Sequence, residues 1–207
     1  MQVAAGLMEK LLEHLNAGRE ARSFGLPENE LFAQAWRELG LLTAKPVIYC
    51  ANVDESGGEK RHVEALRKLA HERNAGFTSI CARLEEELQG LEPEERQEML
   101  ASYGIGKSGL ENVIRSGYDV LGLRSYFTAG PDEVRAWTIH GGWKAPQAAG
   151  VIHSDFEKGF IRAEVIGYDD YMKYENEAAC RAAGALRVEG KEYVVQDGDV
   201  MHFLFNV

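Results

Sequence analysis

Two short polar segments, each at the end of an apolar run, are the residues of this sequence best suited to bind a ligand. The first is Asn52-Val53-Asp54-Glu55, which follows the apolar run of residues 47–51. The second is Cys81-Ala82, at the end of the run of residues 76–82. Ligands of open α/β sheets bind outside the carboxyl ends of the strands. If the two runs are neighbouring parallel strands, the two segments form one binding edge.

The first segment differs from Asn-Lys-x-Asp, the motif with which G domains read guanine, and the difference has a chemical consequence. In that motif the aspartate accepts hydrogen bonds from the N1–H and the 2-amino group of guanine. Adenine offers neither donor, and an unpaired carboxylate is costly in a desolvated pocket. Here Val53 stands at the lysine position and Glu55 at the aspartate position. We therefore expect weaker selection of guanine, with the Val53 backbone pairing to N6 or N1 of adenine.

Each segment also has a purely structural interpretation, which is favoured when the segment is taken alone. Residues 52–55 are compatible with a strand-to-helix turn that is closed by an Asx cap. Cys81-Ala82 corresponds to the place where G domains present backbone N–H groups to a base, but it also fits the small-residue exit of a buried strand. A nucleophilic role for Cys81 is disfavoured because no histidine lies near it in the sequence.

The segment Gly104-Ile105-Gly106-Lys107-Ser108 ends like a phosphate-binding loop, but it does not fit the full motif. The pattern Gly-x-x-x-x-Gly-Lys-[Ser/Thr] needs glycine at position 101, where this chain has Ala101. We expect a loop between two helices there, and the 207 residues contain no other match. The six histidines have no metal-ligand spacing. We therefore assign no catalytic and no metal-binding residue.

Hydrophobic periodicity predicts the elements that position these segments. Residues 47–51 and 76–82 are typical of strands that are buried on both faces. Helices are expected over residues 59–73, 93–103 and 109–121. In the last of these helices, the residues expected to face inward include Leu110, Val113, Ile114 and Val120. Alternating strands and helices at this spacing predict parallel α/β packing.

The two ends of the chain differ from this α/β region. The apolar spacing predicts one helix over residues 7–15 and a second helix that begins at residues 26–30. Two such neighbouring helices would form a helical hairpin. From residue 124 onward the patterns predict a separate α+β module. Its expected elements are a strand over 134–139, a helix from 145 towards 156, a strand over 160–166, and a closing hairpin of residues 193–195 and 200–205.

The composition limits the compartment and the partners. No apolar run approaches the roughly 20 residues that span a bilayer, and the N-terminus lacks the pattern of a signal peptide. We therefore expect no membrane partner. Three widely spaced cysteines do not suggest disulfides, so we expect the protein to lie in a reducing cytoplasm. A net charge of -10 argues against a protein that coats nucleic acid with its whole surface, and we expect no DNA partner.

Taken together, longer segments resemble the C-terminal part of the YchF (Obg-like) family of P-loop ATPases, which are GTPase-like. The matching segments are residues 42–55, 81–85, 126–130, 134–139, 145–153, 155–163 and 197–207. The resemblance implies three parts. Residues 1–43 would be the latter part of a helical insert, and 44–123 the second half of a P-loop nucleotide-binding domain with a partial α/β sheet. Residues 124–207 would be a TGS domain of β-grasp, ubiquitin-like fold.

The resemblance also implies a function. The family binds ATP in preference to GTP and hydrolyses nucleoside triphosphate with Mg²⁺. The resemblance implies association with ribosomes and a TGS domain that contacts RNA or protein. The residues expected at the purine base are Asn52, Val53, Glu55, Cys81 and Ala82. The phosphate-binding loop and the magnesium ligands of the family would precede Met1. We therefore expect this chain alone not to hydrolyse ATP.

A second function, from a different class, is left open. The chain would then be a TGS-based module that binds ribosomes, RNA or protein without nucleotide. Trp137, Trp143 and Lys144 lie close together around an expected turn, where an aromatic ring with basic neighbours is able to stack on RNA. The alternative is that Trp137 belongs to the core of a sheet and Trp143 to a loop. A metal-dependent or thiol enzyme has almost no support in the residue pattern.

Overall fold

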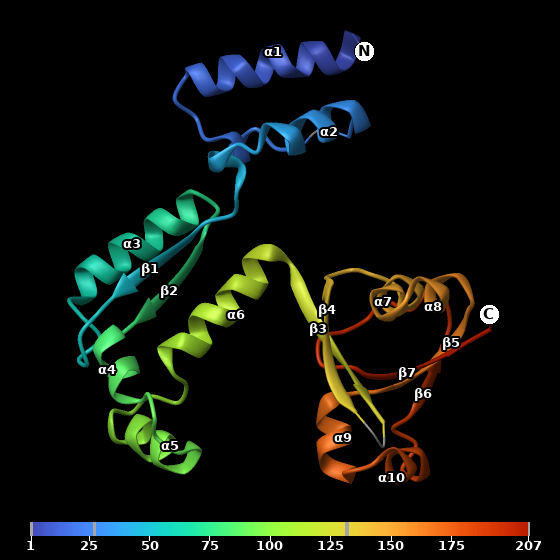
Figure 1. The fold of residues 1–207 in the computed structure, drawn as a ribbon. Helices are drawn as coiled ribbons and strands as arrows, with labels where there is room; N and C mark the ends of the chain where they lie inside the picture. Colours follow the sequence, from blue (N-terminus) through green and yellow to red (C-terminus); the bar gives the residue numbers. More distant parts are fainter. Residues whose placement is uncertain (1, 27, 131–132, 207) are drawn as a thin grey trace. The chain divides into compact units, whose positions relative to one another are not determined.

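The computed structural model describes residues 2–26, 28–130 and 133–206 and divides the chain into two units, Met1–Val120 and Leu121–Val207 (Figure 1). Each unit has its own helices and its own sheet, and we describe each by itself. In the part of the chain that the structure describes, no helix is both long and apolar enough to cross a bilayer.

The first unit begins with the predicted helical hairpin. Helices α1 (Gln2–Asn16) and α2 (Glu30–Leu39) lie side by side, with Leu11 and Phe32 buried (Figure 1). Short 3₁₀ turns, η1 (Ala21–Ser23) and η2 (Leu42–Ala44), follow the two helices. The Asn29 side chain accepts a hydrogen bond from the Phe32 amide at 2.9 Å, so α2 begins at Glu30. Pro27, in the opening segment that we expected, lies outside the described residues.

The α/β region of the first unit follows the predicted alternation. Strands β1 (Ile48–Asn52) and β2 (Gly76–Ile80) are parallel, with Asn52 opposite Ile80, and α3 (Lys60–Glu72) connects them. Helices α4 (Ala82–Glu87), α5 (Pro93–Ser102) and α6 (Gly109–Leu121) come next. Helix α6 approaches β2 closely, because a Cβ atom at Gly76 would lie only 2.6 Å from Val120 Cγ2.

Two predictions for this region are wrong. The strands are not buried on both faces: Cys50 and Asn52 are exposed, and Thr78 alone of the β2 residues is buried. The reason is that, among the described residues, this sheet has two strands, so much of its surface has no neighbour. On α6, Leu110 and Ile114 do not face inward but are 54% and 53% exposed. The apolar pattern of α6 is wider than the face that β2 covers.

The second unit is a five-stranded sheet of order β4-β3-β7-β5-β6. Strands β3 and β7 are parallel neighbours at its centre, and the other pairs are antiparallel. The strands are β3 (Leu123–Ala129), β4 (Val134–His140), β5 (Phe160–Ile166), β6 (Arg187–Glu189) and β7 (Val200–Phe205). The helices are α7 (Ala145–Ile152), α8 (Ser154–Lys158), α9 (Tyr168–Tyr174) and α10 (Glu177–Ala182).

Two buried clusters stabilise the second unit. The larger one joins the sheet to α7 and includes Tyr126, Ile139, Ala148 and Val165, all of which are almost fully buried. The Tyr126 hydroxyl donates a hydrogen bond to the Ala148 carbonyl at 2.9 Å, which satisfies both buried polar groups. The smaller cluster, which includes Cys180, joins the sheet to α9 and α10.

The prediction of a closing hairpin is wrong. Strand β7 pairs with β3 and β5, while residues 193–195 lie beside residues 143–145. The Ala145 amide donates to the Tyr193 carbonyl at 2.9 Å, and the Val195 amide donates to the Trp143 carbonyl at 3.0 Å. The helix expected from 145 towards 156 is also interrupted. His153 is extended, with φ -160° and ψ 142°, and separates α7 from α8.

Candidate functional site

The structure brings together the two segments that the sequence singles out. Asn52 ends β1, and its side-chain oxygen accepts a hydrogen bond from the Ala82 amide at 3.2 Å. Ala82 is the first residue of α4, where backbone amides have no partner within the helix. The Val53 amide donates to the Ile80 carbonyl at 2.8 Å and so extends the ladder between β1 and β2. The carboxyl ends of both strands therefore form one edge.

The loop after β1 is held by the carboxylate of Asp54. One oxygen of Asp54 accepts hydrogen bonds from the Ser56 amide, the Ser56 hydroxyl and the Gly58 amide. The hydroxyl of Ser56 and the amide of Gly58 keep the pKa of Asp54 below its ordinary 3.8. Gly58 has φ +74°, and a Cβ atom there would lie 2.9 Å from Val53 Cγ1. The position therefore requires glycine on both grounds.

Glu55, at the fourth position of the motif, makes an ion pair with a residue of α4. Its Oε1 lies 3.6 Å from Nε of Arg83. Arg83 also lies 3.5 Å from Oε1 of Glu87, one helical turn further on. The side chains of Arg83 and Glu55 are 77% and 38% exposed, so solvent screens this pair.

Two cavities flank this edge, and Val53 and Asp54 line both. The first has a volume of about 310 Å³ and is lined by the loop after β1, the end of β2, α4 and the loop between α5 and α6. The second has a volume of about 490 Å³ and lies against α3. Of the predicted site residues, Glu55 and Cys81 line the first cavity and Asn52 lines the second. Ala82 lines neither cavity, and its role is the bond to Asn52.

One wall of the first cavity has no signature in the sequence. Residues 104–108 form a loop between α5 and α6, as predicted, and Ser108 caps α6 by accepting from the Glu111 amide at 3.1 Å. This loop and its neighbours also line the cavity, through Tyr103, Ile105, Lys107, Gly109 and Asn112. Glu85 of α4 holds the loop in place by accepting a hydrogen bond from the Gly109 amide. No spacing pattern in the sequence marks these contacts.

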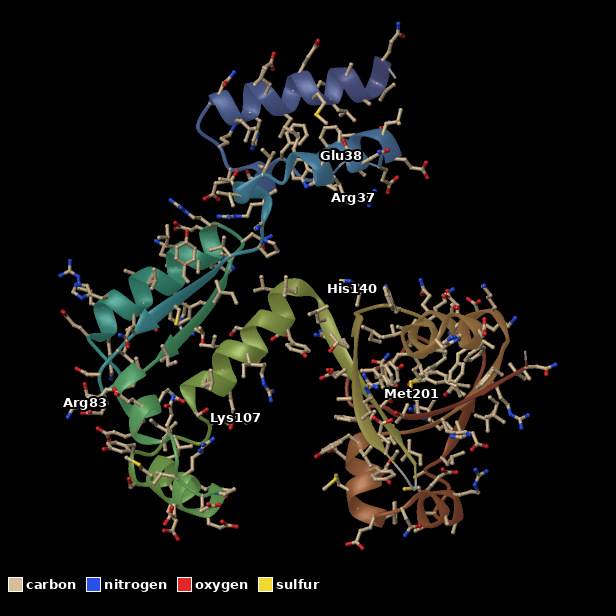
Figure 2. All side chains as sticks on the ribbon, viewed as in Figure 1. Arg37, Glu38, Arg83, Lys107, His140 and Met201 are labelled. Carbon is tan, nitrogen blue, oxygen red and sulfur yellow. The ribbon has the colours of Figure 1, made fainter. Side chains whose placement is uncertain are left out.

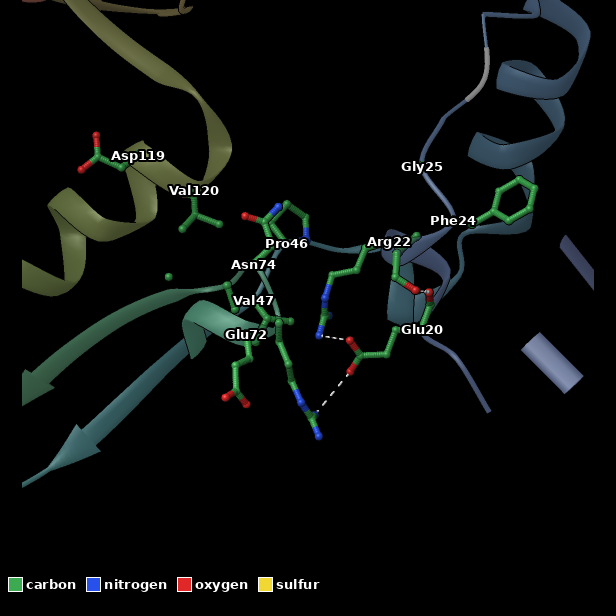
Figure 3. Close-up of a pocket in the computed structure, with 15 residues that line it drawn as sticks. Glu20, Arg22, Phe24, Gly25, Pro46, Val47, Glu72, Asn74, Asp119 and Val120 are labelled. Atoms are coloured by element: carbon green, nitrogen blue, oxygen red, sulfur yellow. Dashed lines mark hydrogen bonds and ion pairs between the residues drawn. The ribbon is translucent and has the colours of Figure 1, made fainter. Parts of the chain in front are cut away.

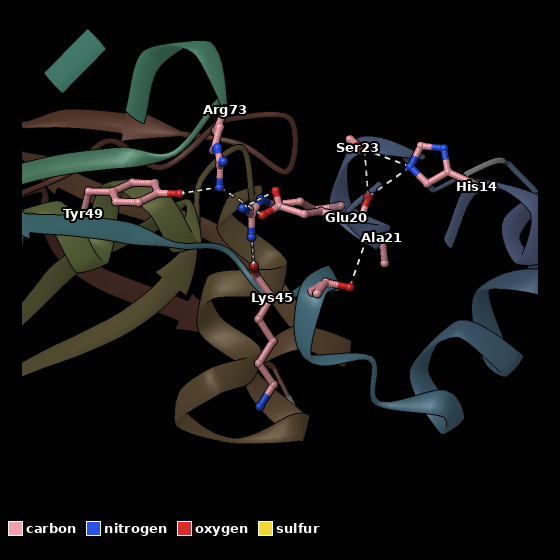
Figure 4. A network of polar contacts seen from close by, with 9 residues as sticks. His14, Glu20, Ala21, Ser23, Lys45, Tyr49 and Arg73 are labelled. Carbon is pink, nitrogen blue, oxygen red and sulfur yellow. Dashed lines mark hydrogen bonds and ion pairs between the residues drawn. The ribbon is translucent and has the colours of Figure 1, made fainter. Parts of the chain in front are cut away.

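A larger cavity, of about 900 Å³, lies at the opposite ends of the strands, beside Val47 and Gly76 (Figure 3). Its charged lining includes Glu20, which is paired with Arg22 and lies 3.7 Å from Arg73. Arg73 also donates a hydrogen bond to the Tyr49 hydroxyl at 3.1 Å (Figure 4). Because ligands of α/β sheets bind at the carboxyl ends, we do not assign the base site to this cavity.

The part of the chain that the structure describes contains no group of three or more His, Cys, Asp or Glu residues that could hold a metal ion. Beside Val53, the first cavity is lined by three carboxylates, those of Asp54, Glu55 and Glu85, and by the ammonium group of Lys107.

Comparisons with known proteins identify the relatives of this chain. Residues 123–206 match the family model YchF-GTPase_C, described as "Protein of unknown function (DUF933)". The chain is 50% identical over 202 residues to the ribosome-binding ATPase YchF of Pasteurella multocida, which covers 97% of this chain and 55% of that protein. It is 47% identical over 207 residues to the ribosome-binding ATPase YchF of Bacillus subtilis, covering 97% of the chain and 56% of that protein.

Solved structures agree with these relatives. The structure of the YchF GTPase of Schizosaccharomyces pombe superposes with a TM-score of 0.76 at 38% identity, covering 96% of this chain and 53% of that one. A GTP-binding protein of Pyrococcus horikoshii matches with a TM-score of 0.54 at 19% identity, which shows likeness of fold alone. The chain spans about 55% of the length of the curated relatives that it matches. The recognition made from the sequence is thus confirmed: this chain is a YchF homologue, and its residues 123–206 match the C-terminal domain of that family.

Proposed function

We propose that residues 44–123 form the base-recognising half of an ATP site, within a chain that serves as the C-terminal portion of a ribosome-binding ATPase of the YchF type. The observation that carries this proposal is the hydrogen bond from the Ala82 amide to Asn52, which joins the two strand ends beside a cavity. The names of the relatives, which are ribosome-binding ATPases, support the nucleotide and the ribosome as partners. The cytoplasm is the corresponding compartment.

The backbone of Val53 favours adenine over guanine. Its amide already donates to the Ile80 carbonyl at 2.8 Å, so it is not available to N1 of adenine. The Val53 carbonyl is the backbone group that remains for the base. Adenine carries a donor at N6, whereas guanine carries the acceptor O6 at the same place. A carbonyl aimed at this position therefore attracts adenine and repels guanine.

Hydrolysis needs groups beyond this half-site. Phosphoryl transfer depends on a loop that cradles the phosphates and on Mg²⁺ between them. The 207 residues contain no Gly-x-x-x-x-Gly-Lys-[Ser/Thr] pattern. We therefore propose that these residues recognise the purine and do not by themselves catalyse the reaction. ATP is the proposed nucleotide and GTP the alternative, and Mg²⁺ would accompany the phosphates in the full-length relatives.

Nucleoside titration of the 207-residue chain tests this proposal. Adenosine and guanosine are added separately, and backbone amide shifts are followed by nuclear magnetic resonance. We expect adenosine to bind more tightly and to shift the amides of Val53 and Ala82. Tighter binding of guanosine would contradict the proposed selectivity, and shifts confined to other regions would contradict the proposed site. ATP turnover by this chain alone would contradict the assignment of the phosphate groups to other residues.

The architecture of the second unit supports a second candidate, a TGS module of residues 124–207 that binds a ribosomal or protein partner without nucleotide. Its first and last strands, β3 and β7, are parallel neighbours at the centre of the sheet, and α7 packs on that sheet, as in a β-grasp. Residues 121–207 contain 9 Lys and Arg against 13 Asp and Glu, which disfavours broad contact with RNA phosphates.

The contacts of Trp137 do not favour its stacking on RNA. Trp137 packs against the buried cluster of the sheet, and its indole N–H donates to Thr128 Oγ1 at 2.9 Å. The Arg135 guanidinium lies 4.2 Å from the centre of the Trp137 ring and covers one face of it. Co-sedimentation of the chain with ribosomes in the absence of nucleotide tests the second candidate, and its failure at low salt would contradict it.

A further inference from the structure

Glu55 presents a difficulty for the proposed preference for adenine. It occupies the position from which an aspartate of G domains reads guanine, it lines the first cavity, and it is itself a carboxylate. Left free, it would be able to accept hydrogen bonds from N1–H and the 2-amino group of guanine. The neighbouring acid does not compete for this role, because the Asp54 carboxylate holds its own loop.

Arg83 lies next to Glu55 and competes with guanine for the Glu55 carboxylate. Its Nε lies 3.6 Å from Glu55 Oε1, and it is the residue that directly follows Ala82 in α4. Glu87 lies 3.5 Å from the same nitrogen and holds the guanidinium on this side of the helix. Figure 2 shows Arg83 beside α4 in the first unit. A guanidinium offers donors to a carboxylate in the same way as the guanine edge does.

We infer that Arg83 is a specificity-determining residue, which occupies the Glu55 carboxylate and thereby keeps it from selecting guanine. The inference rests on the proposed base site. Arg83 acts through Glu55 and not through adenine, so its removal alters the affinity for guanosine and leaves the affinity for adenosine nearly unchanged. Because the pair is exposed, the competition is modest, and we expect a change of about threefold to tenfold in the affinity ratio.

The experiment measures dissociation constants for adenosine and guanosine on the 207-residue chain and three variants. Arg83→Gln should raise the affinity for guanosine relative to adenosine by about threefold to tenfold. Arg83→Lys keeps the charge and should stay close to the unsubstituted chain. Arg37→Gln, at an exposed position on α2 that lines none of the cavities described above, is the matched control and should change nothing (Figure 2).

A double substitution separates competition from a general effect of charge. In a Glu55→Gln background there is no carboxylate for Arg83 to occupy, so adding Arg83→Gln should leave the affinity ratio unchanged. An equal effect of Arg83→Gln in both backgrounds would overturn the inference. Urea midpoints of all variants, which we expect to agree closely because Arg83 is exposed, show that the fold is intact.

Two outcomes separate this inference from the proposed function. If adenosine binds preferentially and Arg83→Gln leaves the affinity ratio within twofold, the base site stands and the role of Arg83 is overturned. If neither nucleoside binds to any of the variants, the proposed base site is wrong, and the inference falls with it.

Discussion

The side-chain oxygen of Asn52 accepts a hydrogen bond from the Ala82 amide across 3.2 Å and joins the ends of two parallel strands. The register places Asn52 opposite Ile80, so the two residues that follow Ile80 turn into α4 within reach of the asparagine. A neutral amide suits this position, because it satisfies a helix amide that has no partner within α4 and adds no charge beside the proposed base site. This bond joins the two segments of the proposed base site.

Removal of the Asn52 side-chain oxygen should weaken the connection between the carboxyl ends of β1 and β2. In Asn52→Ala the Ala82 amide loses its partner, which costs on the order of 1 kcal/mol at a partly exposed position. We expect faster hydrogen exchange at Ala82 and weaker binding of adenosine. Asn52→Asp, which keeps an acceptor oxygen, is the control and should preserve most of the protection of Ala82. Unchanged exchange in Asn52→Ala would show that the bond does not hold the two loops together.

The loop after β1 should respond to acid. Because hydrogen bonds from Ser56 and Gly58 lower the pKa of Asp54 in the folded chain, its contribution is present above the unfolded pKa near 3.8. It is lost as the pH falls through the lower folded value. A carbon nuclear magnetic resonance titration of the Asp54 carboxyl should therefore give a pKa below 3.8.

Ser56→Ala supplies the comparison for this titration. The substitution removes the hydroxyl donor, which is the largest cause of the shift, and keeps the backbone donors. We expect the pKa of Asp54 to move back towards its ordinary value. A carboxyl that titrates identically in both chains would contradict the hydrogen-bonded loop.

Local patterns in the sequence predicted the elements around the candidate site, but not all of their neighbours. The apolar runs before Asn52 and Cys81 identified both strands, since strand length and turn residues are local properties. Residues 193–195 have the same β-type pattern, yet they lie beside residues 143–145 because that pairing is decided by tertiary packing.

The residues that line the first cavity could not be predicted either, because tertiary packing also decides which segments meet there. The sequence predicts the loop of residues 104–108 between two helices, but it does not indicate which surface of the unit that loop covers. Its position follows from the bond between the Gly109 amide and Glu85, residues that lie far apart in sequence. Likewise, the apolar spacing of α6 does not reveal that Ile114 is exposed.

In the second unit, Gly159 occupies a position that tolerates no side chain. Its amide donates to the Asp155 carbonyl at 2.8 Å, and its carbonyl accepts from the Asn206 amide at 2.9 Å. A Cβ atom there would overlap the carbonyl of Asn206 and lie 3.1 Å from the Asp155 oxygen. Backbone atoms on both sides cannot move as freely as side-chain ends. We therefore expect Gly159→Ala to lower the free energy of unfolding by about 1–3 kcal/mol.

Urea denaturation measures this effect, and Gly190→Ala is the matched control. A Cβ atom at Gly190 would meet no atom within 4 Å, and its backbone is not in the left-handed region. That substitution should change the unfolding free energy by roughly 0.5 kcal/mol or less. Equal midpoints for the two variants would contradict the close approach of Asn206 to Gly159.

A buried carboxylate in the second unit predicts a response to alkaline pH. Asp199 is 3% exposed and accepts hydrogen bonds from the Tyr193 hydroxyl at 2.7 Å and the Gln196 amide at 2.9 Å. Burial and the hydrogen bond to Asp199 raise the pKa of Tyr193 to about 12. A raised folded pKa means that this contribution to stability is complete below the unfolded value of 10.0. It is lost as the pH rises through about 12.

Tyr193→Phe should therefore have two effects. It removes a donor from a buried charge, which costs about 1–3 kcal/mol near neutral pH. It also removes the part of the alkaline loss of stability that Tyr193 causes, so the difference from the unsubstituted chain should shrink between pH 10 and 12. Tyr168→Phe, at a tyrosine that is 48% exposed, controls for the loss of a hydroxyl. A difference that stays constant across this pH range would mean that the Tyr193 hydroxyl does not titrate against Asp199 in the folded unit.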